Sequence, residues 1–211
     1  MTTKEKLIES IIRDGYLKNP KIIEAFFAID RAEFVAPEYL KESYENYPLP
    51  IGEGQTISQP LTVAFLLELL DPRPGEKILD IGSGSGWTTA LLAYIVGKKG
   101  RVFGIERIKK LCDFGETNVR KYNFIEKGIV KFSSVDGTLG LPEHAPYDKI
   151  LAGAAASKEI PKAWREQLKI DGKIVAPVGG AVWLFIKKSE KRWEENGYSG
   201  FAFVPLISDK E

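Results

Sequence analysis

The spacing of apolar residues changes near residue 75 of the chain. Before that point apolar residues recur at helical intervals, as at Leu7, Ile11 and Ile12, and predict a first helix. A second helix is predicted after Asn19-Pro20, because asparagine followed by proline is a typical helix start. A third helix is predicted over 60–70. The N-terminal part of the chain is therefore expected to be helical.

From residue 77 onward, short apolar runs rich in β-branched residues alternate with helical patterns. The runs predict strands at 77–81, 101–105, 129–135, 148–152, 173–178, 182–187 and 201–207, with helices at 88–96, 108–122 and 160–168. Strands that alternate with helices of this length favour a parallel sheet with right-handed crossovers. Only the polar segment 189–200 separates the last two strands, which indicates an antiparallel hairpin at the edge of the sheet.

Composition and charge narrow the possible functions. The chain has 211 residues, 30 Lys+Arg against 29 Asp+Glu and 44% hydrophobic residues, which is typical of a soluble globular protein. The charge balance does not indicate a nucleic-acid partner, and no apolar run approaches the ~20 residues that span a bilayer. One cysteine, Cys112, and one histidine, His144, exclude disulfide frameworks, zinc ribbons and Cys/His proteases, and no metal site is predicted. Since residues 1–10 do not resemble a secretory signal, we expect a cytoplasmic protein with no membrane partner.

A glycine-rich turn follows the first strand of the predicted sheet. After Asp80 and Ile81 the turn contains Gly82, Ser83, Gly84, Ser85 and Gly86. Glycines let the backbone approach a ligand where a Cβ would collide. The dinucleotide fingerprint would need glycine at the position of Trp87, and no Gly-Lys-Ser/Thr P-loop sequence follows. The remaining D-x-G-x-G-x-G spacing resembles the S-adenosylmethionine loop of Rossmann-like methyltransferases, in which we expect Asp80 to orient the loop rather than touch the ligand.

Two further acidic positions lie at strand ends. Glu106 follows strand 101–105, about 20 residues beyond the glycine turn, where a carboxylate can accept hydrogen bonds from both ribose hydroxyls. Asp136-Gly137 closes the next strand, where the methyltransferases with this loop place an acid on the adenine amino group. Taken alone, each signal is more often simple turn chemistry or a solvated charge. Together and in this order, they favour a cofactor site.

The segment 48–60 is the most unusual stretch of the chain. It reads Pro-Leu-Pro-Ile-Gly-Glu-Gly-Gln-Thr-Ile-Ser-Gln-Pro and ends in a helix start, because proline is tolerated in a first helical turn. The free amides and the dipole of a helix start favour an anion, and Ser58 adds a hydroxyl donor. Ser58 can also be a plain helix cap, worth about 1 kcal/mol, and both roles can coexist.

The 48–60 segment closely resembles the hallmark of the protein-L-isoaspartate O-methyltransferase family. The resemblance extends from about residue 5 to the end and includes Ala32-Glu33-Phe34-Val35, the 80–86 loop, Asp136-Gly137, 142–148, Ala154-Ala155-Ala156, Pro177-Val178-Gly179 and Phe203-Val204-Pro205-Leu206. It implies a class I S-adenosylmethionine-dependent methyltransferase fold of the Rossmann-like α/β type. The expected sheet is central, mostly parallel and seven-stranded, with an antiparallel C-terminal hairpin and an N-terminal helical extension. Because no linker divides the chain, we expect one domain over 1–211, with the helices and substrate loop in 1–74 and the cofactor-binding core in 75–211.

The resemblance also implies an activity. A methyl group would pass from S-adenosylmethionine to the α-carboxylate of L-isoaspartyl residues in damaged proteins and peptides, leaving S-adenosylhomocysteine; the ester would then cyclise to a succinimide without the enzyme. Thr56, Ile57, Ser58 and Gln59 would bind the substrate, with Ser58 as the catalytic residue. A carboxylate is already ionised at neutral pH, so no histidine base is needed. We expect a monomer, with His144 in a loop and Cys112 in the core.

The chain departs from the family pattern at Asn46, where aspartate is common, and at Trp87, Val135 and Gly153, where tyrosine, glycine and threonine are common. These changes bear on affinity more than on the type of reaction. Ser208 is a candidate for a polar cofactor contact that some members carry. Two alternatives stay open: a carboxyl methyltransferase of another peptide substrate, and a non-catalytic S-adenosylmethionine-binding module. An RNA methyltransferase is disfavoured, since 151–154 is unlike an Asn-Pro-Pro-Tyr motif.

Overall fold

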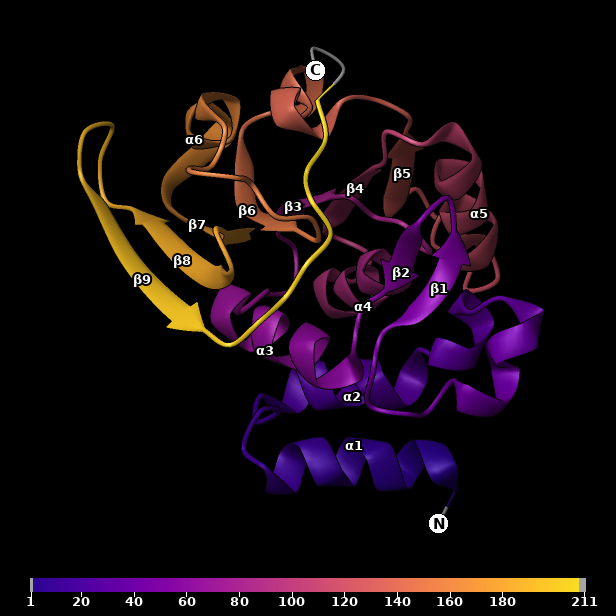
Figure 1. Ribbon diagram of the computed structural model, residues 1–211. Helices are drawn as coiled ribbons and strands as arrows, with labels where there is room; N and C mark the ends of the chain where they lie inside the picture. The colour runs from indigo at the N-terminus through magenta and orange to yellow at the C-terminus, as the bar shows by residue number, and fades with distance from the viewer. Residues whose placement is uncertain (1, 209–211) are drawn as a thin grey trace.

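A computed structural model describes residues 2–208 of the chain (Figure 1). The helices are α1 (Thr3–Arg13), α2 (Pro20–Ala28), α3 (Pro60–Leu70), α4 (Trp87–Val96), α5 (Lys109–Arg120) and α6 (Lys162–Gln167). Short 3-10 helices lie at Arg31–Phe34, Pro37–Glu42, Gly137–Leu139 and Pro142–His144. The strands are β1 (Leu49–Gly52), β2 (Gln55–Ile57), β3 (Lys77–Ile81), β4 (Arg101–Ile105), β5 (Val130–Ser133), β6 (Tyr147–Ala152), β7 (Leu168–Val178), β8 (Ala181–Lys187) and β9 (Trp193–Ser199).

The central sheet has seven strands in the order β5-β4-β3-β6-β7-β8-β9. The pairs from β5 to β7 are parallel, whereas β7–β8 and β8–β9 are antiparallel. The predicted architecture is confirmed, including the N-terminal helices, which lie below the sheet in Figure 1. No helix of the described residues is both long and apolar enough to cross a membrane.

Alternating side chains of each strand pack on opposite faces of the sheet. On β3, Ile78 joins a core cluster with residues of α1 to α5, whereas its neighbour Leu79 joins a second cluster with Trp164 of α6. Both side chains are fully buried. This period of two is the reason that the strands of a sheet covered on both faces appear as continuous apolar runs.

One strand prediction is wrong. The edge strand is β9, in the segment expected to be a turn, whereas 201–207 is extended chain outside the sheet, with one isolated bridge between Pro205 and Ala155. Three apolar side chains of this segment instead face the core: Phe201 and Phe203 pack against the larger cluster and Leu206 packs against the other. The antiparallel C-terminal pairing is therefore present, but β8 and β9 form it.

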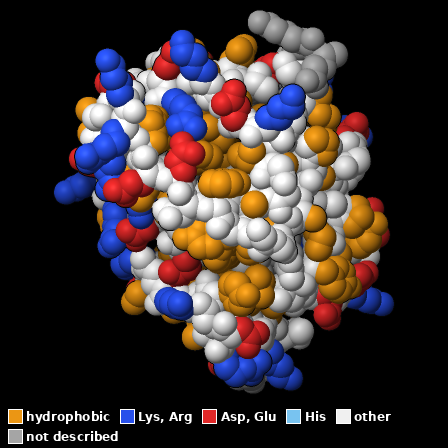
Figure 2. All heavy atoms as spheres, turned by 60° about the vertical axis from the view of Figure 1, so that its left-hand side comes forward, with side chains coloured by type: hydrophobic (Ala, Val, Ile, Leu, Met, Phe, Trp, Pro, Cys, Tyr) orange, Lys and Arg blue, Asp and Glu red, His pale blue; other side chains and the backbone are white. Residues whose placement is uncertain are grey.

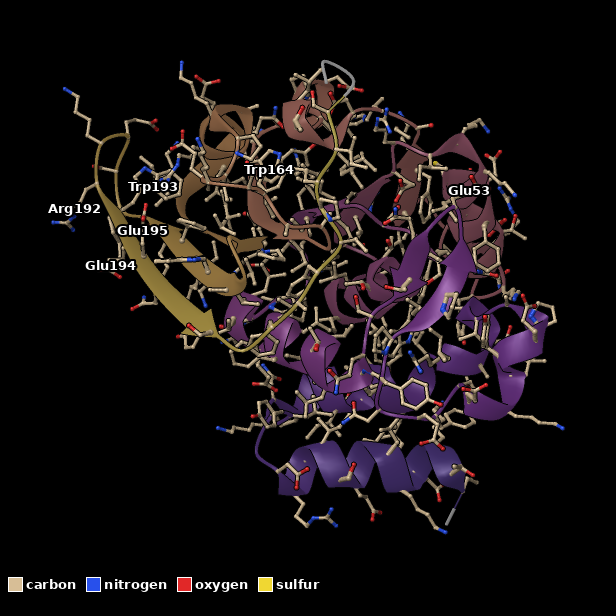
Figure 3. All side chains as sticks on the ribbon, in the orientation of Figure 1. Glu53, Trp164, Arg192, Trp193, Glu194 and Glu195 are labelled. Atoms are coloured by element: carbon tan, nitrogen blue, oxygen red, sulfur yellow. The ribbon has the colours of Figure 1, made fainter. Side chains whose placement is uncertain are left out.

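The segment 48–60 folds largely as a two-stranded hairpin. Leu49 pairs with Ile57 and Pro50 with Thr56, so the sequence expected to be a loop forms β1 and β2. Glu53 lies at the tip of the hairpin with a φ of 53°. Its carboxylate forms an ion pair with the Lys110 ammonium of α5 (2.7 Å), and Figure 3 shows Glu53 on the side of the hairpin near α5. The hairpin leads directly into α3, which begins at Pro60 as predicted.

Candidate active site

A cleft lies between the β1–β2 hairpin and the carboxyl ends of β3 and β4. The space between its walls is about 990 Å³ when the open mouth is included. β3 has β4 on one side and β6 on the other, so the cleft lies at the point where the strand order reverses, a preferred place for ligands in such sheets. Of the predicted site residues, it is lined by Thr56, Ile57, Ser58, Gly82, Ser83, Gly84, Ser85, Glu106 and Gly137. Gln59, Gly86 and Asp136 lie outside this lining.

Gly86 lies beneath the glycine turn, where it packs against α5. A Cβ added to Gly86 would come within 2.7 Å of the Gly115 carbonyl oxygen, and one added to Gly115 would come within 2.7 Å of the Gly84 carbonyl oxygen. The backbone of the turn and that of α5 are therefore in direct contact. This contact fixes the position of the turn relative to α5, so Gly86 supports the cleft without lining it.

The wall of the cleft contains buried polar atoms that no group of the described residues satisfies. The Ser83 hydroxyl and the Trp87 indole nitrogen are buried and have no hydrogen-bond partner within residues 2–208. Both residues line the cleft. Since buried donors are normally paired, these two fit a polar ligand. Trp87 lies in this wall at a position where tyrosine is common in the family that the sequence resembles.

Glu106 is held at the end of β4 by two backbone donors. The Gly84 N–H donates to one carboxylate oxygen (3.1 Å) and the Ile108 N–H donates to the other (3.0 Å). An ionised carboxylate has about four lone-pair sites, so each oxygen keeps acceptor capacity for the hydroxyls of a ribose. The glycine turn and the acid predicted to face the ribose are thus linked directly.

Asp136 begins the short helix that carries Gly137. One of its oxygens accepts from the Thr138 N–H (2.8 Å) and hydroxyl (2.7 Å), and Ser208 lies 3.4 Å from the other. Gly137 lines the cleft, and its carbonyl accepts from the Trp164 indole (2.8 Å), whose position on α6 is shown in Figure 3. A Cβ on Gly137 would meet Ile81 at 2.7 Å. This strand end is therefore fixed by α6 and by its own cap.

The opposite wall carries Ser58 between the end of β2 and the start of α3. Gln59, not Ser58, is the N-cap residue of α3, so the interpretation of Ser58 as a helix cap is wrong. The first turn is capped from a distance, because the Asn46 side-chain oxygen accepts from the Leu61 N–H (3.0 Å). The Gln59 side chain donates to the Asn46 carbonyl (2.8 Å), which turns it away from the cleft.

Comparison with known proteins identifies the family. The family model of protein-L-isoaspartate(D-aspartate) O-methyltransferase matches residues 2–211. The chain belongs to the protein-L-isoaspartate(D-aspartate) O-methyltransferase family. A protein-L-isoaspartate O-methyltransferase of Methanopyrus kandleri is 42% identical over 211 residues, which cover 98% of this chain and 92% of that protein. One from Dictyoglomus thermophilum is also 42% identical, over 207 residues that cover 96% and 90%.

Solved structures agree with this family. A structure named protein-L-isoaspartate O-methyltransferase has a TM-score of 0.87 at 30% identity and covers 98% of this chain and 66% of that chain. The Plasmodium falciparum beta-aspartate methyltransferase (PCMT), solved with S-adenosyl-L-homocysteine, has a TM-score of 0.87 at 24% identity and covers 98% and 99%. The expected family, fold class and enzyme class are confirmed, and so is S-adenosylmethionine as the methyl donor that this family uses.

Asp80, the first residue of the family's glycine-loop pattern, is bound to α4. Its carboxylate is buried and accepts a hydrogen bond from the Thr89 hydroxyl (2.6 Å). Burial raises the pKa of Asp80 to about 7, and the Thr89 hydrogen bond opposes this rise. Asp80 therefore joins the end of β3 to the first turn of α4, which is a different link from the expected one to the loop amides.

Some residues of the site gave no clear signal in the sequence. Arg31 is buried below Ser58, and Gly115 contacts the glycine turn from α5. A glycine within a helix can have many roles, so the sequence alone does not identify Gly115 as part of the site. Only its contact with Gly86 in the folded chain does so. Val204 and Leu206 line the cleft although their segment was expected to be a strand. His144 ends the short 3-10 helix Pro142–His144, not a loop as expected, and it stacks on Phe103, 4.3 Å between ring centres.

Proposed function

We propose that Ser58 holds the α-carboxylate of an L-isoaspartyl residue, while the glycine turn and Glu106 hold S-adenosylmethionine. One observation carries this assignment: Ser58 and the turn line the same cleft although they come from different regions of the fold. The cofactor supplies an electrophilic methyl group on a sulfonium. The family's activity on isoaspartyl proteins supports the identity of the acceptor.

The residues around Ser58 orient an acceptor that is already reactive. A carboxylate with an ordinary pKa near ~4 is ionised at neutral pH, so no side chain has to remove a proton. The Ser58 hydroxyl can donate to one carboxylate oxygen and leave the other free to attack. Apolar side chains of the cleft wall, among them Ile57 and Val63, exclude water from the reacting groups. The chain therefore contributes alignment and partial desolvation, which can lower the activation barrier by several kcal/mol.

Glu106, Gly137 and Asp136 are proposed as the nucleoside side of the site. Glu106 keeps acceptor capacity for ribose hydroxyls, as its backbone partners leave lone pairs open. Gly137 lines the cleft next to Asp136 and is therefore proposed to lie beside the base. The Asp136 carboxylate, next to it, is proposed to accept from the adenine amino group. The unpaired Ser83 hydroxyl is a further donor for the cofactor.

The test compares two peptides that differ only in an aspartyl or isoaspartyl linkage, with labelled S-adenosylmethionine as donor. Only the isoaspartyl peptide is expected to become labelled, and equal labelling of both would exclude the repair function. Ser58→Ala is expected to lower kcat by about tenfold or more while the Kd for S-adenosylhomocysteine stays within about twofold, since one donor to a reacting oxygen is lost. Ser10→Ala, on α1, is the matched control. An unchanged kcat in Ser58→Ala would reject the catalytic role.

We also propose that 1–211 is one domain acting as a cytoplasmic monomer without nucleic-acid or membrane partners. The larger core cluster supports one domain, because it contains side chains of α1 to α3 as well as of the sheet. On the face turned forward in Figure 2, basic and acidic side chains are interspersed, which does not favour a nucleic-acid partner. Sedimentation of the purified chain tests the monomer, and a larger species would exclude it.

A further inference from the structure

Arg31 is a buried cation with an unusual set of partners. Arg31 is the first residue of the 31–34 helix, directly after the Asp30 cap, and it is only 3% exposed. One terminal nitrogen donates to the carbonyls of Ser43 (2.8 Å) and Glu45 (3.3 Å), and the other donates to those of Tyr47 (3.0 Å) and Ser58 (3.2 Å). Within residues 2–208 it forms no ion pair with a carboxylate, although buried charges are normally paired.

The guanidinium fixes the two ends of the substrate hairpin. Tyr47 precedes β1 and Ser58 follows β2, and a single nitrogen of Arg31 binds both carbonyls. The Ser58 carbonyl and the Gln59 N–H belong to the same peptide unit, and in a planar trans unit these two groups point in opposite directions. The Gln59 N–H therefore points away from Arg31. Arg31 therefore sets the orientation of the backbone on which the Ser58 hydroxyl is mounted.

The charge of Arg31 also lies directly behind the cleft wall. Its central carbon is 5.5 Å from the centre of the Trp87 ring, and both Trp87 and Ser58 line the cleft. Burial lowers the pKa of Arg31 to about 10, which leaves it charged at neutral pH. Four carbonyl oxygens accept from its two terminal nitrogens but carry no net negative charge, and its buried Nε has no hydrogen-bond partner among residues 2–208. The uncompensated positive charge is therefore closest to the wall where an anionic substrate is proposed to bind.

We infer that Arg31 is a positioning and selectivity residue whose missing counter-charge is the ionised α-carboxylate of the substrate. This inference rests on the proposed binding of the isoaspartyl group at Ser58. A charge in a desolvated wall attracts an anion much more strongly than a neutral group of the same shape. Arg31 would thus favour the acid that is the substrate over the uncharged ester that is the product.

The test measures binding of two peptides to the enzyme saturated with S-adenosylhomocysteine. One peptide carries the isoaspartyl α-carboxylate, and the other carries the neutral α-carboxamide at the same place. The unaltered enzyme is expected to bind the acid at least about tenfold more tightly, by calorimetry, which corresponds to about 1.4 kcal/mol. Arg31→Gln is expected to reduce this preference to about threefold or less, with the Kd for the amide changed much less than that for the acid. A purely structural role would weaken acid and amide equally.

Two further variants sharpen the outcome. Arg31→Lys keeps the charge but cannot reach four carbonyls, so it should keep the preference for the acid while kcat falls. Arg13→Gln, at the exposed end of α1, should change neither Kd. An unchanged preference in Arg31→Gln overturns the inference. If Arg31→Gln does not fold, the unaltered enzyme and Arg31→Lys decide, because equal binding of acid and amide to either one also overturns it. The proposed function is judged separately, by methylation of the isoaspartyl peptide by the unaltered enzyme.

Discussion

The contact between Gly86 and α5 can be tested by adding one methyl group. Gly86 has a φ of +84°, and a Cβ there would lie 2.7 Å from the Gly115 carbonyl oxygen and 3.0 Å from Val119. The positive φ costs an alanine about 1–2 kcal/mol. Overpacking against backbone adds about 1–3 kcal/mol, because α5 cannot yield as a flexible side chain can. We therefore expect Gly86→Ala to lower the free energy of unfolding by about 2–5 kcal/mol.

Gly128→Ala separates the two contributions. Gly128 also has a positive φ, +64°, but nothing lies within 4 Å of a Cβ at that position. Both variants gain the same stabilisation from a less flexible unfolded chain, so this effect cancels in their difference. The expected difference between them is the overpacking energy alone, about 1–3 kcal/mol.

Urea unfolding of both variants at one pH gives the two free energies, and calorimetry with S-adenosylhomocysteine gives the Kd. Gly86→Ala should also weaken this binding by about tenfold or more, because the displaced turn carries the Gly84 N–H away from Glu106. Gly128→Ala should leave the Kd unchanged. Equal unfolding free energies for the two variants, within about 0.5 kcal/mol, would refute the contact as the reason for glycine at this position.

Two other perturbations have expected outcomes that unfolding experiments can measure. Asp80 keeps its proton up to about pH 7 in the folded protein, whereas it loses its proton near pH ~4 in the unfolded chain. The free energy of unfolding, measured relative to that of Asp80→Asn, should therefore fall as pH rises from about 4 to 7, by at most about 1.4 kcal/mol per pH unit. Urea unfolding across this range measures it, and parallel pH curves would contradict the raised pKa. Glu53→Gln removes an ion pair whose Lys110 side chain is 80% exposed, and it should cost less than about 1 kcal/mol in thermal or urea unfolding. A larger loss would mean that the hairpin tip has a structural role of its own.

The sequence predicted the strands of the parallel half well because they are buried on both faces. β3 and β4 lie at the predicted residues, and α3 begins at Pro60. The edge of the sheet could not be predicted in this way. Residues 194–199 of β9 are exposed and polar, and they pair with β8 through the backbone, so they have no apolar signature. Conversely, Phe201 and Phe203 are packed on the core without belonging to any strand.

The candidate site could also be predicted only in part from the sequence. The glycine turn, Glu106 and Ser58 belong to short sequence patterns whose spacing is set by one strand end or one loop, and the structure brings them to one cleft. The partners of these residues come from distant parts of the chain. Arg31 reaches Ser58 across 27 positions, and Gly115 meets Gly86 only after α5 has packed on the turn. Such contacts depend on the complete fold, and no local pattern reveals them.

The two walls of the cleft are built from separate parts of the fold, and this has an evolutionary consequence. The side proposed to hold the nucleoside is built from the ends of β3, β4 and β5, which are fixed by the central sheet, whereas the side proposed to hold the acceptor is built from the β1–β2 hairpin, which pairs with no strand of that sheet. A lineage could therefore replace or reshape the hairpin without altering the machinery that holds the donor. Acquisition of a new methyl acceptor would require few compensating changes in the rest of the chain.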